Sequence, residues 1–161
     1  TGEPVADGEP GELVFTSLSK EAMPIIRYRT RDLTRLLPPT ARSFRRMGKI
    51  VGRSDDMLII RGVNVFPSQI EAGLMAIDAV LPHYLIVVDK TNGLDTLEIK
   101  VEVTPETFSD DIKSLEKLRA RIGHAVQRII NINASITLVE PHTLPRSEGK
   151  LRRVNDLRKK A

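Results

Sequence analysis

Cysteine and tryptophan are absent from this 161-residue sequence, and aromatic residues make up only 4% of it. Without cysteine the chain has no disulfides, no thiolate metal ligands and no cysteine nucleophile, which fits a cytoplasmic protein. The scarcity of aromatic side chains argues against a stacking platform for single-stranded nucleic acid. No run of about 18 apolar residues occurs, so the sequence predicts no membrane-spanning helix.

Several familiar catalytic signatures are missing as well. The histidines, His83, His124 and His142, are scattered along the chain without the spacing of metal ligands, so no metal site is predicted. No GxSxG motif is present to support acyl-enzyme chemistry. The Gly149–Lys150 pair does not belong to a P-loop, because leucine stands where that motif requires a glycine and a Ser or Thr.

Positive charge is concentrated in two stretches of the chain. Residues 27–53 contain nine Lys or Arg and one acid, and residues 146–161 contain seven Lys or Arg and two acids. The net charge is only +4, so the other residues are acidic overall. This pattern indicates an anionic partner, although two solvated basic faces would give the same counts.

The first part of the chain, residues 1–54, resembles the end of a larger β-rich domain. Its opening stretch TGEPVADGEPGELVF predicts turns leading into a strand, and therefore a chain that begins inside a longer protein. Few large apolar residues are present, so this part is expected to depend on missing chain. The two prolines at residues 38 and 39 predict a loop. Short strands are expected at residues 12–18, 24–28, 32–37 and 44–51.

The remainder of the chain predicts a small α/β (α+β) domain with a mixed sheet. A hairpin that turns at Arg61 and Gly62 precedes a helix that begins at Pro67 or Ser68. Ser68 and Glu71 have the spacing of a capping box. The switch from a short apolar run to helical periodicity therefore predicts a strand–turn–strand–helix unit here.

Two longer strands follow this unit. The continuous apolar run at residues 83–89 is typical of a central strand. In LEIKVEV, residues 97–103, apolar side chains alternate with Glu98, Lys100 and Glu102. This alternation predicts one buried face and one wet face.

A long amphipathic helix and a last strand complete the predicted domain. The helix is capped by Ser109, and residues 135–140 form the strand after it. From residue 63 the order is β-α-β-β-α-β, the ferredoxin-like ordering. Lys150 then lies on a loop, and a basic terminal helix is expected after it. The predicted buried stripe of the long helix consists of Ile112, Leu115, Leu118, Ile122, Val126 and Ile129.

Three clusters carry the chemically active side chains. Asp32 in a basic strand can accept hydrogen bonds from sugar hydroxyls, and Arg53 can fork onto a phosphate. Each also has a structural explanation: Asp32 as an ion-pair partner, Arg53 with Asp55 as a surface pair, and Lys150 as a solvated loop residue. The residues alone therefore indicate an anion-binding α/β domain. The clusters are YRTRDL at 28–33, GRSDDMLIIRGVNVFPSQIE at 52–71 and LPRSEGK at 144–150.

These clusters, in this order, resemble the adenylate-forming enzymes of the acyl-CoA synthetase superfamily, and most closely their phenylacetate–CoA ligase branch. The resemblance covers nearly the whole chain. The family motif usually has the form Y-[RK]-T-G-D-L, and Arg31 replaces its glycine here, a departure typical of that branch. VNVFPSQIE, residues 63–71, also matches the branch. Three motifs in register are far more specific than any one of them.

The resemblance implies a role for five residues. Asp32 matches the acid that holds the ribose hydroxyls of ATP, and Arg53 matches an arginine that also reaches the nucleotide. Asp55 matches the hinge between a large and a small domain. Gly62 matches the glycine that lines the pantetheine path, and Lys150 matches the catalytic lysine of the first half-reaction.

The same resemblance implies an AMP-forming ligase whose small domain, residues 55–161, rotates between two half-reactions. The first adenylates an aryl acid such as phenylacetate, and the second forms its CoA thioester. ATP, CoA and Mg²⁺ are implied, with Mg²⁺ bound mainly by a missing amino-terminal domain that also carries the phosphate loop and the acyl pocket. This chain alone is therefore expected to be inactive. A homodimer is usual among proteins of this kind.

Two other classes are alternatives. A ferredoxin-like regulatory domain would bind a small effector at a strand–helix or dimer edge and would give Lys150 no role. A nucleic-acid-binding module would use the two basic stretches, and its binding would fall steeply with salt. The scarcity of aromatic residues opposes the second alternative.

Overall fold

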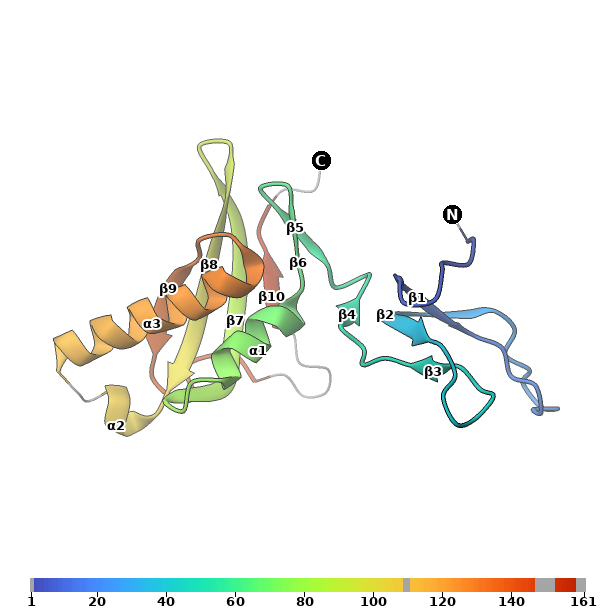
Figure 1. Ribbon diagram of the computed structural model, residues 1–161. Coiled ribbons are helices and arrows are strands. Elements are labelled where there is room, and N and C mark those ends of the chain that lie inside the picture. The colour runs from blue at the N-terminus through green and yellow to red at the C-terminus, as the bar shows by residue number, and fades with distance from the viewer. Residues whose placement is uncertain (1, 109–110, 147–152, 159–161) are drawn as a thin grey trace. The chain divides into compact units, whose positions relative to one another are not determined.

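A computed structural model describes residues 2–108, 111–146 and 153–158, and it divides the chain between Met57 and Leu58 into two units. The first unit contains β1 (Pro10–Phe15), β2 (Tyr28–Leu37), β3 (Arg46–Met47) and β4 (Gly52–Arg53). The second unit contains β5 (Leu58–Ile60), β6 (Val63–Val65), α1 (Pro67–Met75), β7 (Val80–Thr91), β8 (Leu94–Val103), α2 (Pro105–Phe108), α3 (Ile112–Ile130), β9 (Ser135–Val139) and β10 (Val154–Asp156) (Figure 1).

The first unit is built around β2, which pairs antiparallel with β1, β3 and β4. The predicted strand at residues 24–28 is wrong, because Ile25 lies in the β1–β2 connection, where its carbonyl accepts a hydrogen bond from the Ser17 amide at 2.7 Å. Arg27 also has a φ of 49°, in the left-handed region rather than in the extended region of a regular strand. The strand expected at residues 44–51 shortens to the two-residue β3.

The second unit contains a four-stranded mixed sheet in the order β10-β7-β8-β9. β7 and β8 form an antiparallel hairpin that turns at Asn92 and Gly93, whose φ values of 52° and 82° suit the tight turn that favours Asn-Gly. β9 lies parallel to β8, and β10 lies parallel to β7. The predicted mixed sheet and the β-α-β-β-α-β order from β6 to β9 are confirmed. However, β6 pairs with β5, and β10 completes the sheet.

Among the described residues 153–158, β10 takes the place of the predicted terminal helix, so that prediction is wrong there. Val154 lies opposite Ile86 in a parallel ladder. The Ile86 amide donates to the Arg153 carbonyl at 2.9 Å, and the Leu157 amide donates to the Val88 carbonyl at 2.8 Å. A short helix is marginal in water, whereas the open edge of β7 offers these residues ready backbone partners.

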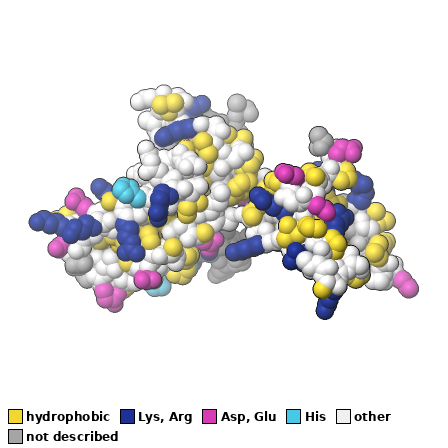
Figure 2. All heavy atoms as spheres, in the orientation of Figure 1, with side chains coloured by type: hydrophobic (Ala, Val, Ile, Leu, Met, Phe, Trp, Pro, Cys, Tyr) yellow, Lys and Arg dark blue, Asp and Glu magenta, His cyan; other side chains and the backbone are white. Residues whose placement is uncertain are grey.

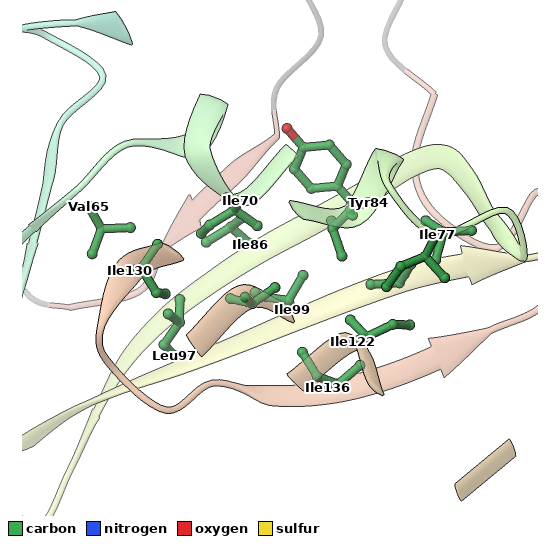
Figure 3. Close-up of a cluster of buried hydrophobic side chains, with 14 of the residues drawn as sticks. Val65, Ile70, Ile77, Tyr84, Ile86, Leu97, Ile99, Ile122, Ile130 and Ile136 are labelled. Atoms are coloured by element: carbon green, nitrogen blue, oxygen red, sulfur yellow. The ribbon is translucent and has the colours of Figure 1, made fainter. Parts of the chain in front are cut away.

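The core of the second unit lies between the sheet and two helices. α1 and α3 cover the same face of the sheet (Figure 1). Ile99 and Val101 of β8 are fully buried under them, as the alternating pattern predicted. Tyr84 of β7 belongs to the apolar cluster, and its hydroxyl points away from the other labelled side chains (Figure 3).

The helix α1 begins at Pro67, one of the two predicted start residues, and does not use the predicted capping box of Ser68 and Glu71. Pro67 is its first residue and Phe66 its N-cap. The Phe66 amide donates to the Gln69 side chain at 3.2 Å, which satisfies one of the free donors at the helix start. Ser68 and Glu71 are therefore not the capping pair, and the predicted capping box is wrong.

The long helix α3 begins with an aspartate cap. The Asp111 carboxylate accepts a hydrogen bond from the Ser114 amide at 2.7 Å. Ser109, the predicted cap, lies outside the described residues. The predicted stripe is shifted at both ends, because Ile112 is 76% exposed and Ile129 is 38% exposed. The buried residues of α3 are Leu118, Ile122, Val126 and Ile130.

Gly73 lets α1 approach α3 closely. A Cβ at this position would lie 2.8 Å from Cδ1 of Ile129, the movable end of a partly exposed side chain. We expect Gly73→Ala to raise the free energy of unfolding slightly, by less than about 1 kcal/mol, because helix propensity favours alanine and Ile129 can rotate away. Urea unfolding followed by circular dichroism measures this change. A loss of stability would show that Ile129 is fixed.

Candidate functional site

Asp32 and Arg53 are held together by strand pairing in the first unit. They lie directly opposite each other where β2 pairs with β4. Nη1 of Arg53 is 3.3 Å from Oδ1 of Asp32. The Asp32 side chain is 25% exposed, so its carboxylate is reachable from solvent. Two residues that lie 21 positions apart in the sequence thus form one polar surface.

Asp55 joins this pair through a forked ion pair. Nε and Nη2 of Arg53 donate to the two Asp55 carboxylate oxygens at 3.0 and 2.9 Å, and Asp56 lies 3.7 Å from Nε. The hydrogen bonds from Arg53 hold the pKa of the Asp55 carboxyl below its usual range. Arg53 thus presents a planar fork to a bidentate anion, a geometry that a phosphate also fits.

Arg31 has a backbone conformation that normally favours glycine. Its φ is 70°, in the left-handed region, and its carbonyl accepts a hydrogen bond from the Ser54 amide at 2.7 Å. Thr30 supports the same turn, because its hydroxyl accepts a hydrogen bond from the Asp32 amide at 3.1 Å. The position that is usually glycine in the family motif therefore shapes the backbone immediately before Asp32.

Gly62 lies at the exposed tip of the β5–β6 hairpin. Arg61 and Gly62 form the turn with φ values of 50° and 78°, as the sequence predicted. Ile60 and Val65 anchor the hairpin in the core, with exposures of 1% and 0%. Apart from Gly62 and its two chain neighbours, no heavy atom of the described residues lies within 4 Å of the point where a Cβ of Gly62 would be. A ligand can therefore approach the backbone of the turn closely.

Lys150 lies outside the described residues, but the chain leading to it ends in a buried ion pair. Glu102 of β8 is 0% exposed, although the alternation predicted a wet side chain. Nη2 of Arg146 donates to its Oε2 at 2.7 Å, and the Leu144 amide donates to its Oε1 at 3.0 Å. Burial raises the pKa of the Glu102 carboxyl, but these hydrogen bonds outweigh burial and lower the pKa overall.

The chain after Lys150 is held by a second polar cluster. The guanidinium of Arg153 lies 4.7 Å from the ring centroid of Tyr84. Its Nη1 donates to the Tyr84 hydroxyl at 3.0 Å and forms an ion pair with Glu71 of α1. Burial raises the pKa of Tyr84 to about 12, although the Arg153 hydrogen bond opposes this shift. Arg146 before Lys150 and Arg153 after it are thus both anchored by side-chain contacts within the second unit.

Two further observations concern metals and membranes. In the part of the chain that the structure describes, no three His, Asp or Glu side chains are grouped as metal ligands. Within the same residues no helix combines the length and apolar character needed to cross a membrane.

A comparison of the sequence with protein-family models identifies the family of the second unit. Residues 62–158 match the family model of the AMP-binding enzyme C-terminal domain. The chain belongs to this family. Phenylacetate-coenzyme A ligase of Aromatoleum evansii is 53% identical over 162 residues, which cover 99% of this chain and 37% of that protein. This chain thus spans little more than a third of the length of the curated relatives that it matches. It corresponds to their carboxy-terminal portion.

Solved structures of one adenylate-forming ligase resemble this AMP-binding enzyme C-terminal domain in two states. 2-Hydroxyisobutyryl-CoA ligase in the postadenylation state, in complex with R3-HIB-AMP, is 33% identical, covers 94% of this chain and 33% of its own, and has a TM-score of 0.83. The same ligase in complex with 2-HIB-AMP and CoA, in the thioesterfication state, is 33% identical, covers 96% and 33%, and has a TM-score of 0.62. The mixed α/β fold class predicted from the sequence is thereby confirmed.

The structure brings some of the predicted site residues together and leaves others apart. Asp32, Arg53 and Asp55 form one cluster, whereas Gly62 belongs to the other unit. Asp55 lies two residues before the division between the units, and its role as a hinge stays a prediction. Sequence reasoning missed Glu102, because the strand pattern gave it a solvated face. The sequence showed only that Glu102 is an acidic residue in a strand. It did not show that the chain at Leu144 and Arg146 covers that face of the strand.

Proposed function

We propose that this chain is the carboxy-terminal part of an AMP-forming ligase that joins phenylacetate, or a related aryl acid, to CoA. The observation that carries the proposal is the 53% identity to a phenylacetate-coenzyme A ligase across 99% of the chain. The cluster of Asp32, Arg53 and Asp55 supports it, because a carboxylate and a guanidinium fork are the groups that sugar hydroxyls and phosphates require.

The first unit supports a missing amino-terminal domain. Among residues 2–57, Thr34 alone is buried, so the unit has no apolar core of its own. Large hydrophobic side chains are exposed instead, and yellow side chains are visible at the surface around β1 to β4 in Figure 2. Exposed apolar side chains in this number are typical of a surface that another part of the protein covers. The strongest exposures are those of Leu18 at 95%, Met23 at 87%, Phe44 at 81% and Ile26 at 72%.

The first half-reaction of the proposed enzyme forms an acyl adenylate. A carboxylate oxygen of the acid attacks the α-phosphorus of ATP, the bond to the bridging oxygen breaks, and pyrophosphate leaves with the electron pair. Asp32 holds the ribose hydroxyls and Arg53 reaches the nucleotide. Lys150 bridges the substrate carboxylate and the α-phosphate, where its charge stabilises the negative charge that develops in the transition state.

The second half-reaction forms the thioester. The CoA sulfur, having lost its proton, attacks the acyl carbon, and AMP leaves with the electrons of the broken carbon–oxygen bond. The backbone at Gly62 lines the pantetheine path, and the second unit rotates about Asp55 between the steps. Different TM-scores of 0.83 and 0.62 to one ligase in two states support this, because that ligase must differ in shape between its states over the matched region.

The remaining parts of the proposal lie outside this chain. Mg²⁺ would neutralise phosphate charge, and we assign it to the preceding domain, since the described residues offer no group of three ligands. The intact ligase is proposed to be a cytoplasmic protein and a homodimer.

One experiment tests the proposed function directly. The intact product of the gene that carries this chain is incubated with phenylacetate, ATP and CoA, in parallel with the 161-residue chain alone. We expect the intact protein to release phenylacetyl-CoA, AMP and pyrophosphate in equal amounts, and the chain alone to release none. Acyl-CoA formation by the chain alone would contradict the fragment proposal. No adenylation of any aryl acid by the intact protein would contradict the ligase proposal.

A further inference from the structure

Asp95, at the start of β8, connects the tip of the β5–β6 hairpin to the main sheet. Its Oδ2 accepts a hydrogen bond from the Arg61 amide at 3.1 Å. Its backbone carbonyl accepts a second hydrogen bond from Nε of Arg61 at 2.7 Å. Both the backbone and the side chain of the residue before Gly62 are therefore tied to Asp95.

Arg158, just after β10, reaches the same place from the end of the chain. Its Nη1 donates to the Ile59 carbonyl at 2.6 Å and lies 3.3 Å from Oδ2 of Asp95. Its Nε and Nη2 donate to the two carboxylate oxygens of Asp156 at 2.9 and 2.6 Å, which fix the plane of the guanidinium. The side chains of Arg158 and Asp95 are only 23% and 20% exposed. One arginine thus joins the hairpin, β8 and β10.

The hairpin needs this support because it is short. Each strand has three residues, and a two-stranded hairpin is marginal in water by itself. Ile60 and Val65 hold its inner side in the core, but Gly62 at the tip has open space around it. The position of the turn therefore depends on the polar contacts that Asp95 and Arg158 make with Ile59 and Arg61.

We propose that Asp95 and Arg158 are positioning residues for thioester formation, because they hold the hairpin turn where the Gly62 backbone guides the pantetheine arm. This inference rests on the proposed function. A displacement of about 1 Å in a guiding element can cost up to about 10²-fold in rate, because the reacting atoms lose their alignment. In the proposed reaction the hairpin acts only in thioester formation, so the two half-reactions separate this role from general stability.

The test uses the intact gene product and follows the half-reactions separately. In Arg158→Gln we expect thioester formation from phenylacetyl adenylate and CoA to fall about tenfold or more. Pyrophosphate release from phenylacetate and ATP should change by less than about twofold. Arg158→Lys, which keeps one donor for the Ile59 carbonyl, should recover part of the rate. Arg119→Gln, on the exposed side of α3, is the matched control and should leave both rates unchanged.

Hydrogen exchange of the same proteins tests the contact without any catalysis. We expect amides of residues 58–65 to exchange faster in Arg158→Gln and in Asp95→Asn than in the wild type. Amides of α3 should keep their wild-type exchange rates. This result would show that the two side chains hold the hairpin, whether or not the enzyme uses it.

Each outcome decides between the inference and the proposed function. An unchanged thioester rate in Arg158→Gln, or equal losses in both half-reactions with a lower melting temperature, would overturn the positioning role. A wild type that forms no adenylate would overturn the ligase proposal itself, and with it this role. A selective loss of thioester formation together with faster hairpin exchange would support both.

Discussion

Replacing Lys150 with alanine in the intact gene product should lower pyrophosphate release from phenylacetate and ATP by about 10²- to 10³-fold. The ammonium group would no longer stabilise the charge that builds up between the carboxylate and the α-phosphate. Thioester formation from pre-made phenylacetyl adenylate and CoA should be largely unaffected, since the proposed rotation withdraws the lysine before that step. Separate assays of pyrophosphate and of acyl-CoA measure the two effects.

Lys113→Ala, on the exposed side of α3, is the control for removing a lysine from the same unit. It should leave both half-reactions unchanged. If Lys150→Ala also left both unchanged, Lys150 would be a solvated loop residue, and the ferredoxin-like regulatory domain would become the leading explanation.

Replacing Glu102 with glutamine should destabilise the 161-residue chain by about 2–3 kcal/mol at pH 7. Glutamine keeps the size of the side chain and can still accept from the Leu144 amide. Its amino group, however, would face Nη2 of Arg146, which now donates to a carboxylate at 2.7 Å. A charged hydrogen bond is thereby replaced by two opposing donors at a fully buried position. Urea unfolding followed by circular dichroism measures the loss.

Glu98→Gln is the matched control for Glu102→Gln, because Glu98 lies on the same face of the same strand. Its Oε1 accepts from the Thr137 hydroxyl at 2.7 Å, which a glutamine oxygen can also do, and the side chain is 36% exposed. We expect its effect to stay within about 0.5 kcal/mol. Equal losses in the two variants would show that the burial of Glu102 has no special energetic importance.

The pH dependence of Glu102→Gln follows from the lowered pKa of the Glu102 carboxyl. The folded pKa lies below the ordinary value of 4.5, so the ionised carboxylate stabilises the folded state fully above about pH 4.5. This contribution is lost as the pH falls through the folded pKa. The stability difference between wild type and Glu102→Gln should therefore be largest at neutral pH and should narrow below about pH 4.5. A difference that widened in acid would contradict the lowered pKa.

Local patterns explain which parts of the fold could be predicted. The Arg61–Gly62 turn and the buried positions of Ile99 and Val101 depend on neighbours in the sequence, and both were predicted correctly. Glu102 was placed wrongly, because alternation tells which side chains share a face but not what covers that face. β10 was missed because its partner, β7, lies more than sixty residues away in the sequence.

The candidate site also contains residues that the sequence could predict and residues that it could not. Asp32, Arg53 and Asp55 were singled out from motifs, and the structure adds that one arginine contacts both carboxylates. Asp95 and Arg158 could not be found, because their contact joins residues 63 positions apart that belong to no motif. The motif residues carry local signatures in the sequence, whereas the proposed positioning residues act through tertiary contacts.

The anchors on either side of Lys150 set how far its amine can travel. Lys150 follows Arg146 by four residues and precedes Arg153 by three. Since a chain spans at most about 3.6 Å per residue, four residues reach at most about 14 Å from Arg146 and three residues reach at most about 11 Å from Arg153. Both anchors and the hairpin with Gly62 belong to the second unit. In the proposed two-step reaction, a longer movement of the lysine would carry that whole unit, so the departure of the amine and the arrival of the hairpin would be a single displacement.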